Sequence, residues 1–196
     1  MSIFLDESEQ LPAQTPLHQL GAALRAVQDR VSSTNAPPEI ALQAAKTLQD
    51  VASLLEEYRY LVSRDKSWDD IRRSGGSRTL APELFDVAQT EERLDAHVRY
   101  SAFYLGGNGA VHGGAIPLLM DQVLGRVANH GRPICRTAYL NIDFRQVTPI
   151  DKDLRIEGFI ERIEGRKRYV YGAMYDEDLL MIEAHGLFIE LKPGGQ

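Results

Sequence analysis

The segment from residue 116 to residue 128 constrains the fold more than any other part of the chain. It is the most apolar helix candidate, and its apolar residues cover nearly the whole circumference: Ile116, Leu118, Leu119, Met120, Val123, Leu124, Val127 and Ala128. A helix that is apolar on all sides has to be buried on all sides. Pro117 is tolerated only in the first turn of a helix, which places the start near Gly113 or Gly114. The rest of the fold must therefore wrap around this helix.

Strand-like patterns precede and follow this helix. The preceding strand is expected at 98–105, and the later ones at 134–147, 153–163, 167–175 and 179–192. In the segment 134–147, apolar and polar residues alternate, which is typical of a strand with one buried face. We therefore expect Ala138, Leu140 and Ile142 on one face, with Thr137 and Asn141 on the other. One strand, a buried helix and an antiparallel meander predict an α+β fold in which a sheet wraps around a central helix.

The chain before residue 93 divides into three parts. Residues 1–16 are polar and contain two prolines, so we expect a flexible N-terminus. Within 17–63, apolar residues recur at spacings of three and four on both sides of a break at 32–38, which predicts two antiparallel helices as an N-terminal extension. Residues 64–92 are charged and contain glycines, and we interpret them as a connector. The main domain is then expected to cover 93–193.

Charge and cysteine content argue against several classes of protein. The 22 Lys and Arg residues against 28 Asp and Glu residues give a net charge of −6, which disfavours a nucleic-acid-binding protein. The single Cys135 allows neither an internal disulfide nor a multi-cysteine zinc site. No apolar run reaches the roughly 18 residues of a membrane span, and the acidic start differs from a signal peptide. We therefore expect a cytoplasmic protein that has no membrane span and needs neither a metal nor a separate cofactor.

A glycine-rich helix start and an acid within the helix suggest catalysis. Gly113 and Gly114 leave room for a ligand carbonyl to approach backbone N–H groups, where the helix dipole favours negative charge. Asp121 lies in the apolar helix, where an ionised carboxylate is costly unless it is paired or used, although a purely structural role is the alternative. At about 1.5 Å per residue, Asp121 lies roughly 10 Å along the axis from Gly114. Two antiparallel helices can bring Asp121 of one chain beside Gly113 of another, so the spacing favours a symmetric dimer with shared sites.

The run Gly109-Ala110-Val111-His112-Gly113-Gly114-Ala115, with Asp121 nine residues after the histidine, resembles the hotdog-fold thioesterases. The similarity is to their PaaI-like group, and within it to acyl-CoA thioesterases related to the mitochondrial long-chain enzymes. It continues through 137–144, 164–167 and 183–191 and covers about residues 95 to 192. The resemblance implies a hotdog fold and hydrolysis of an acyl-CoA to a free acid and coenzyme A, which enters only as part of the substrate. It also implies a homodimer or a dimer of dimers.

The resemblance implies a role for each matching residue. Asp121 corresponds to the family's carboxylate, which acts as general base on water or as nucleophile. The Gly113 N–H corresponds to the oxyanion donor, with Gly114 beside it at the substrate. His112 acts in positioning or in proton transfer, and Thr137 corresponds to a polar residue that orients the attacking water in the long-chain relatives.

One position departs from the family pattern. Many PaaI-like enzymes carry an asparagine six residues before the histidine, where this chain has Gly106. Either Asn108 substitutes for it, or the chain uses the constellation of the long-chain relatives. Four cationic residues are candidates for binding the phosphates of coenzyme A, with a solvated surface as the alternative: Arg145, Arg166, Lys167 and Arg168.

Three alternatives to a thioesterase stay open at this point. The first is a non-catalytic acyl-CoA-binding protein of the same fold. The second is a hotdog hydratase or dehydratase, and the third is a protein whose helical extension serves mainly in interactions. The donor is coenzyme A or acyl carrier protein. Our prediction is an acyl-CoA thioesterase in which Asp121 activates water, Thr137 holds that water and Gly113 polarises the thioester carbonyl.

Overall fold

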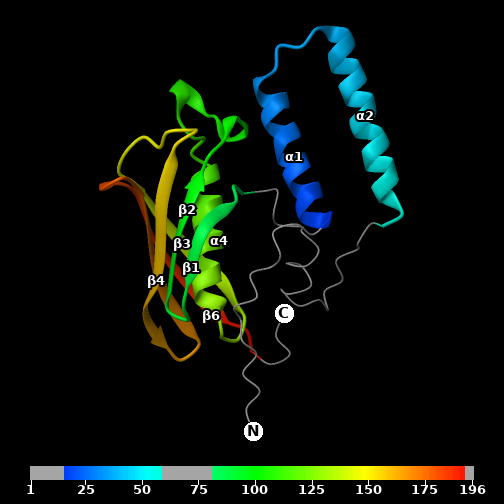
Figure 1. Ribbon diagram of the computed structural model, residues 1–196. Coiled ribbons are helices and arrows are strands. Elements are labelled where there is room, and N and C mark those ends of the chain that lie inside the picture. The colour runs from blue at the N-terminus through cyan, green and yellow to red at the C-terminus, as the bar shows by residue number, and fades with distance from the viewer. Residues whose placement is uncertain (1–15, 59–80, 193–196) are drawn as a thin grey trace. The chain divides into compact units, whose positions relative to one another are not determined.

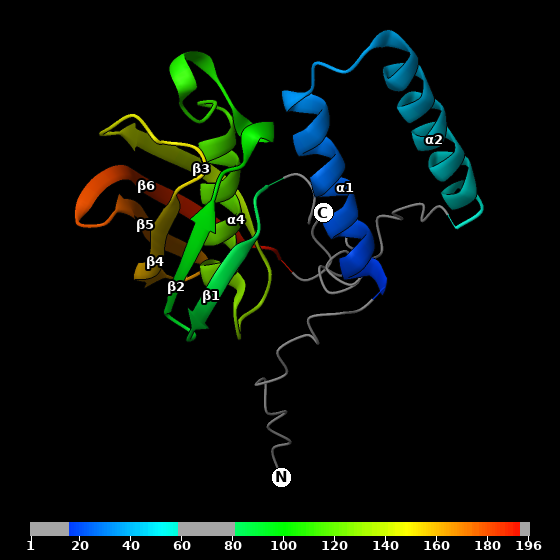
Figure 2. The ribbon, with the colours of Figure 1, turned by 45° about the horizontal axis from the view of Figure 1, so that its top comes forward.

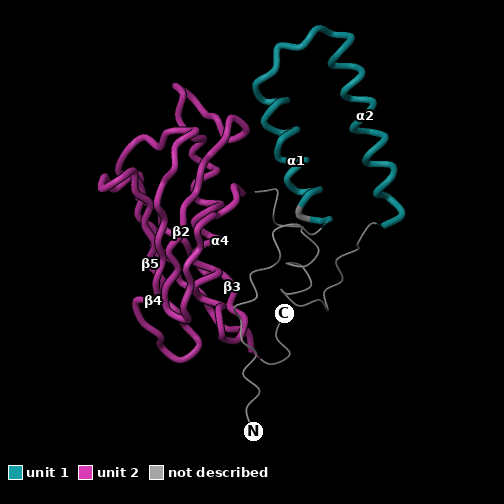
Figure 3. The backbone as a smooth tube through the Cα atoms, in the orientation of Figure 1, with its two compact units in different colours: residues 1–80 teal, residues 81–196 magenta. Residues whose placement is uncertain are grey.

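The computed structural model describes residues 16–58 and 81–192, which belong to two compact units, residues 1–80 and 81–196 (Figure 3). The predicted flexible N-terminus lies outside the described residues, except for Pro16, which begins the first helix. Residues 59–80, which include the end of the predicted helical extension and most of the predicted connector, lie outside them as well. Each unit is described by itself.

The N-terminal unit contains the two predicted helices. α1 covers Pro16–Ser33 and α2 covers Pro38–Glu56 (Figure 1). Pro38 is the first residue of α2, where a missing N–H costs nothing because that position has no acceptor within the helix. No residue of α1 or α2 whose burial the structure describes is buried, so the apolar faces of both helices are exposed. Neither they nor the other described helices are long and apolar enough to cross a membrane.

The C-terminal unit is a six-stranded antiparallel sheet curved around one long helix (Figures 1 and 2). The helix, α4, covers Ala115–Asn129, so Pro117 lies in its first turn as predicted. The strands are β1 Leu84–Gln89, β2 Arg93–Arg99, β3 Cys135–Phe144, β4 Asp153–Glu164, β5 Lys167–Asp176 and β6 Leu179–Glu190. Their order in the sheet is β1-β2-β4-β5-β6-β3, which places β3 at one edge. The predicted α+β fold with its central helix and N-terminal helices is therefore confirmed.

Two expectations about strand positions are wrong. β1 lies within the segment 64–92 that we expected to be a connector. An irregularity between Phe85 and Ala88, with Asp86 at φ 50, interrupts the alternation that would reveal this strand. The strand expected at 98–105 instead ends at Arg99. Beyond it, Asp151 donates its N–H to the Tyr100 carbonyl, and residues 102–104 form a short 3-10 helix.

The side of α4 that faces the sheet packs against three glycines. Gly158, Gly172 and Gly186 belong to β4, β5 and β6. A Cβ atom added at Gly172 would lie 2.7 Å from Leu124 Cδ2 and 2.9 Å from Met120 Cε. The glycines therefore allow the large side chains of α4 to lie closer to the sheet than any other residue type would permit.

The other side of α4 is only half-buried. Leu118, Asp121, Gln122 and Gly125 keep part of their surface exposed, and Arg126 is exposed. The expectation that this helix is buried on all sides is therefore wrong for this stripe, because the sheet of one chain covers only part of the helix. The stripe contains the acid that the sequence singles out.

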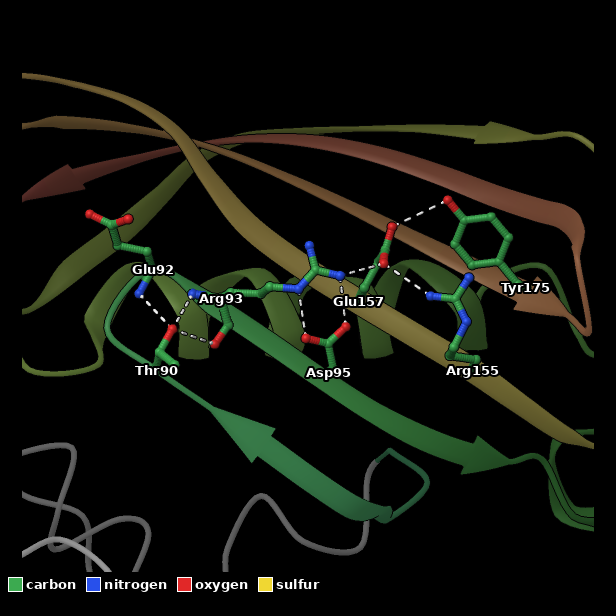
Figure 4. A network of polar contacts seen from close by, with 7 residues as sticks. All are labelled: Thr90, Glu92, Arg93, Asp95, Arg155, Glu157 and Tyr175. Atoms are coloured by element: carbon green, nitrogen blue, oxygen red, sulfur yellow. Dashed lines mark hydrogen bonds and ion pairs between the residues drawn. The ribbon is translucent and has the colours of Figure 1, made fainter.

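The outer face of the sheet carries charged side chains that are linked to one another (Figure 4). Arg93 donates to Asp95 at 2.6 Å and to Glu157 at 2.7 Å. Glu157 also accepts hydrogen bonds from Arg155 at 3.0 Å and from the Tyr175 hydroxyl at 3.2 Å. These residues alternate along their strands with buried apolar ones, so the sheet has one apolar and one polar face, as is common for antiparallel sheets.

Candidate active site

The chain before α4 forms a tight turn that leaves one backbone donor available. His112 donates its N–H to the Tyr104 carbonyl at 2.7 Å, and Ala115 donates its N–H to the His112 carbonyl at 2.9 Å. Gly114 donates its N–H to His112 Nδ1 at 3.0 Å. The Gly113 N–H between them makes no hydrogen bond to any described residue, and Gly113 is exposed. It lies at the positive end of the α4 dipole and is therefore suited to receive a developing negative charge.

The space around Gly113 is open, whereas the space around Gly114 is filled by the histidine. A Cβ atom at Gly113 would meet no atom within 4 Å, but one at Gly114 would lie 3.2 Å from His112 Nδ1. Because Nδ1 accepts the Gly114 N–H, a neutral His112 carries its proton on Nε2. The histidine thus orders the turn, which fits the positioning role that the resemblance implies.

The departure at position 106 has a steric reason. A Cβ atom at Gly106 would lie 2.8 Å from the Cα and 3.0 Å from the N of His112, so an asparagine cannot occupy this position without a backbone shift. Asn108 lies in the short turn Gly107–Gly109 with φ 56 and is exposed. Among the described residues, no hydrogen bond links its side chain to the His112 turn, so a role for Asn108 stays a prediction.

Asp121 and Thr137 lie together, as predicted. Thr137, on β3, donates its hydroxyl to Asp121 Oδ1 at 2.8 Å. Asp121 lies on the half-buried stripe of α4, so one carboxylate oxygen is fixed while the group as a whole stays accessible. The hydrogen bond selects one orientation of the carboxylate.

A β-bulge in β3 turns Thr137 toward α4. The pairing of β3 with β6 shifts between Thr137 and Tyr139, so Ala138 has no partner of its own. Before the bulge, Cys135 is buried and Thr137 contacts α4, and after it Leu140 packs against the core. The expectation that Thr137 and Leu140 lie on opposite faces is therefore wrong, because one extra residue reverses the alternation. A strictly alternating strand would point Thr137 away from Asp121.

Two hollows lie at the two ends of this constellation. The first, of about 420 Å³, lies beside Gly113 and is lined by Ala110, Val111, Gly113, Ile116, Phe144, Arg145, Gln146, Val147 and Thr148. The second, of about 360 Å³, lies beside Thr137 and is lined by Arg136, Thr137, Ala138, Arg166, Ile189, Glu190, Leu191 and Lys192. Gly113 therefore lines the first hollow, and Thr137, which holds the Asp121 carboxylate, lines the second, although Asp121 itself lines neither. Each end of the constellation holds half of the predicted machinery.

Two of the four cations proposed for the phosphates line these hollows, one in each. Arg166 lines the second hollow together with Arg136 and Lys192, which sequence reasoning missed because their spacing in the chain gives no signal. Arg145 lines the first hollow, where it donates to Glu183 at 2.7 Å and so holds the pKa of Glu183 below its usual value. Lys167 is exposed at the start of β5 and lines neither hollow.

Arg168 has a structural environment, unlike Arg145 and Arg166. Its side chain is only 4% exposed. It donates to the carbonyls of Ala128 and Pro133 at 2.6 and 2.8 Å and to Glu190 Oε2 at 2.8 Å. Arg168 therefore satisfies one carbonyl at the C-terminal end of α4 and one just beyond it, and three of its donors are used within the fold.

Comparison with known proteins shows which class of protein this fold is similar to. Residues 108–182 match the family described as the thioesterase superfamily. A crystal structure of a thioesterase superfamily protein superposes with a TM-score of 0.76 at 24% identity and covers 90% of this chain and 91% of its own. The C-terminal unit therefore has the hotdog fold, and its residues 108–182 are similar to the thioesterase superfamily, so the predicted resemblance is confirmed.

Individual relatives are similar to about half of the chain. Acyl-coenzyme A thioesterase THEM4 of Rattus norvegicus is 38% identical over 107 residues, which are 54% of this chain and 46% of the rat protein. This chain therefore matches about half the length of that curated relative. A Streptococcus mutans protein whose crystal structure contains acetyl-CoA superposes with a TM-score of 0.52 at 20% identity, covering 55% of this chain and 89% of its own.

Proposed function

We propose that this protein is an acyl-CoA thioesterase whose active site lies between two copies of the hotdog domain. The observation that carries the proposal is the Asp121 carboxylate, which Thr137 fixes on the same helix whose N-terminus presents the unbonded Gly113 N–H. A general base and an oxyanion donor are the two groups that hydrolysis of a thioester requires. The similarity to acyl-coenzyme A thioesterases supports coenzyme A as the thiol carrier.

The reaction follows from these groups. Thr137 donates its hydroxyl hydrogen to Asp121, so its oxygen lone pairs can accept a hydrogen bond from a water molecule beside the carboxylate. Asp121 takes a proton from this water as the water oxygen bonds to the thioester carbon. The carbonyl electron pair moves onto the oxygen, which the Gly113 N–H stabilises. When the C–S bond breaks, the thiolate leaves and receives the proton from Asp121, which yields a free acid and coenzyme A.

A homodimer supplies the missing half of each site. β3 is an edge strand, paired only with β6, and it exposes 44% of Tyr139 and 53% of Phe144. Exposed edge strands of this kind invite pairing with another chain. Pairing of two β3 strands across a two-fold axis would set the α4 helices antiparallel, with the Gly113 hollow of one chain beside the Thr137 hollow of its partner. This arrangement would also cover the half-buried stripe of α4.

The second hollow is suited to the phosphates of the coenzyme. Arg136, Arg166 and Lys192 line it, and phosphates favour such cations through charge-assisted hydrogen bonds. Among the described residues, Arg166 donates only to the Glu190 carbonyl, at 2.8 Å, so it keeps donors for a ligand. The cytoplasmic location stays a prediction, because no residue of the site bears on it.

The test is release of free thiol from a panel of acyl-CoA esters of different chain length, with Asp121→Asn as the key variant. The amide cannot accept the proton, so we expect kcat to fall by roughly 10²- to 10⁴-fold. Thr137→Val should lower kcat by roughly 10- to 100-fold, the value of one hydrogen bond to a charged group, and Thr137→Ser should retain most of the activity.

Asp95→Asn is the matched control, because Asp95 is a half-exposed carboxylate on the outer face of the sheet (Figure 4). Its activity should equal that of the unchanged protein. Near-normal turnover by a folded Asp121→Asn variant would contradict the assignment of the base. Tight binding of acyl-CoA esters without thiol release by the unchanged protein would favour a binding protein instead, and faster turnover of acyl carrier protein esters would change the donor.

A further inference from the structure

The two N-terminal helices carry an apolar seam that no part of the proposed active site uses. In α1, the seam residues follow at alternating spacings of three and four: Leu17, Leu20, Leu24, Val27 and Val31. In α2, the same spacing recurs: Ala41, Ala44, Leu48, Val51 and Leu55. This is the repeat with which helices pack against other helices through interlocking side chains. The spacing is therefore suited to packing of each seam against another helix.

These seams are exposed in the part of the chain that the structure describes. Leu24 is 43% exposed on α1, and Leu48 is 39% exposed on α2. Isolated helices of 18 and 19 residues are marginal in water, since most helical stability in proteins comes from packing of an apolar face. Two helices with complete seams and no buried residue among those described therefore require a partner surface.

We propose that the partner is a second copy of this chain, whose α1 and α2 complete a four-helix bundle with those of the first. The seams are self-complementary, because both helices carry the same spacing. Seven of the ten seam side chains are large apolar residues that are 39–61% exposed, so a second copy would find apolar surface along both helices: Leu17, Leu20, Leu24, Val31, Leu48, Val51 and Leu55. Alanines flank the larger residues of α2, which widens its apolar face beyond the narrow seam of a two-stranded coil, as a bundle requires.

Charge favours the pairing of α1 with α2 of the other copy. Arg25 and Arg30 against Asp29 give α1 one surplus positive charge. Lys46 against Glu39, Asp50 and Glu56 gives α2 two surplus negative charges. When α1 of each copy packs against α2 of the other, opposite net charges therefore lie side by side. One symmetric contact then covers the seams of both helices. The proposal concerns the N-terminal unit alone and does not depend on the reaction of the hotdog domain.

The test measures the distance between two copies by pulsed electron paramagnetic resonance on the full chain. Cys135 is buried, so a spin label can be directed to a cysteine introduced at the exposed Ala26 of α1, with the parent chain as the check for labelling of Cys135. Neighbouring helices in bundles lie about 8–10 Å apart, so two labels on one bundle should give a distance below roughly 40 Å.

The seam variant is Leu24→Gln with Leu48→Gln, and the matched control is Leu42→Gln. Leu42 is 72% exposed and lies on the side of α2 away from the seam. We expect the short distance to disappear in the seam variant and to persist in the control, with urea unfolding of the hotdog domain unchanged in both. Absence of a short distance in the labelled parent chain would overturn the proposal and point to another occupant. Persistence of the distance in the seam variant would overturn it as well.

Discussion

Arg166 and Arg168 lie two residues apart in the chain, yet the fold surrounds them differently. Arg168 makes three hydrogen bonds inside the protein, and Arg166 makes one to an exposed carbonyl beside a hollow. A buried guanidinium with its donors used stabilises the fold, whereas an exposed one with donors remaining can bind an anion. At the scale of single residues, burial and the number of partners therefore separate structural from ligand-binding cations.

The two arginines should respond differently to substitution. Arg168→Leu leaves two carbonyls and the Glu190 carboxylate without their donor, so we expect a loss of about 2–4 kcal/mol in the free energy of unfolding. Arg166→Gln should stay within about 0.5 kcal/mol of the unchanged protein, while its KM for acyl-CoA rises. Urea unfolding and steady-state kinetics measure both quantities. A stable Arg168→Leu variant with a raised KM would contradict this structural role and support Arg168 as a phosphate ligand.

Sequence patterns at the scale of elements predict what is regular and miss what is irregular. The apolar segment 116–128 predicts α4 within one residue at each end, because helical periodicity and Pro117 both restrict its position. β1 is not predicted because Asp86 interrupts its alternation. The bulge at Ala138 puts Thr137 on the opposite face of β3 from the one that strict alternation predicts. The family resemblance predicts that Thr137 and Asp121 act on the same water molecule. The bulge that brings the two side chains together depends on how β3 pairs with β6.

The close packing of α4 on the sheet depends on glycines, which sequence reasoning did not single out. We expect Gly172→Ala to lower the free energy of unfolding by about 1–3 kcal/mol, because its Cβ would overlap Leu124 and Met120. Gly107→Ala is the matched control, since a Cβ atom there meets nothing within 4 Å, and it should change stability by no more than about 0.5 kcal/mol. Equal urea midpoints for the two variants would contradict this account of the packing.

At the scale of the whole molecule, we propose that each chain contributes one half to each of two active sites, and that a second copy supplies the other half of both. The Gly113 donor opens into one hollow and the Asp121–Thr137 pair lies beside another. The exposed β3 edge and the half-buried stripe of α4 are the surfaces that a second copy would cover. An active dimer would then depend on residues from both chains at each site.

Complementation between two inactive variants tests this claim most directly. Asp121→Asn lacks the base, and Gly113→Pro lacks the donor, with Gly113→Ala as the control that retains the N–H. Each of the two variants should be nearly inactive alone. After the two are unfolded together and refolded as a mixture, random pairing makes half of the dimers mixed, and each mixed dimer contains one intact site, so activity should return to about a quarter of normal. A mixture as inactive as its separate components would contradict a site shared between two chains.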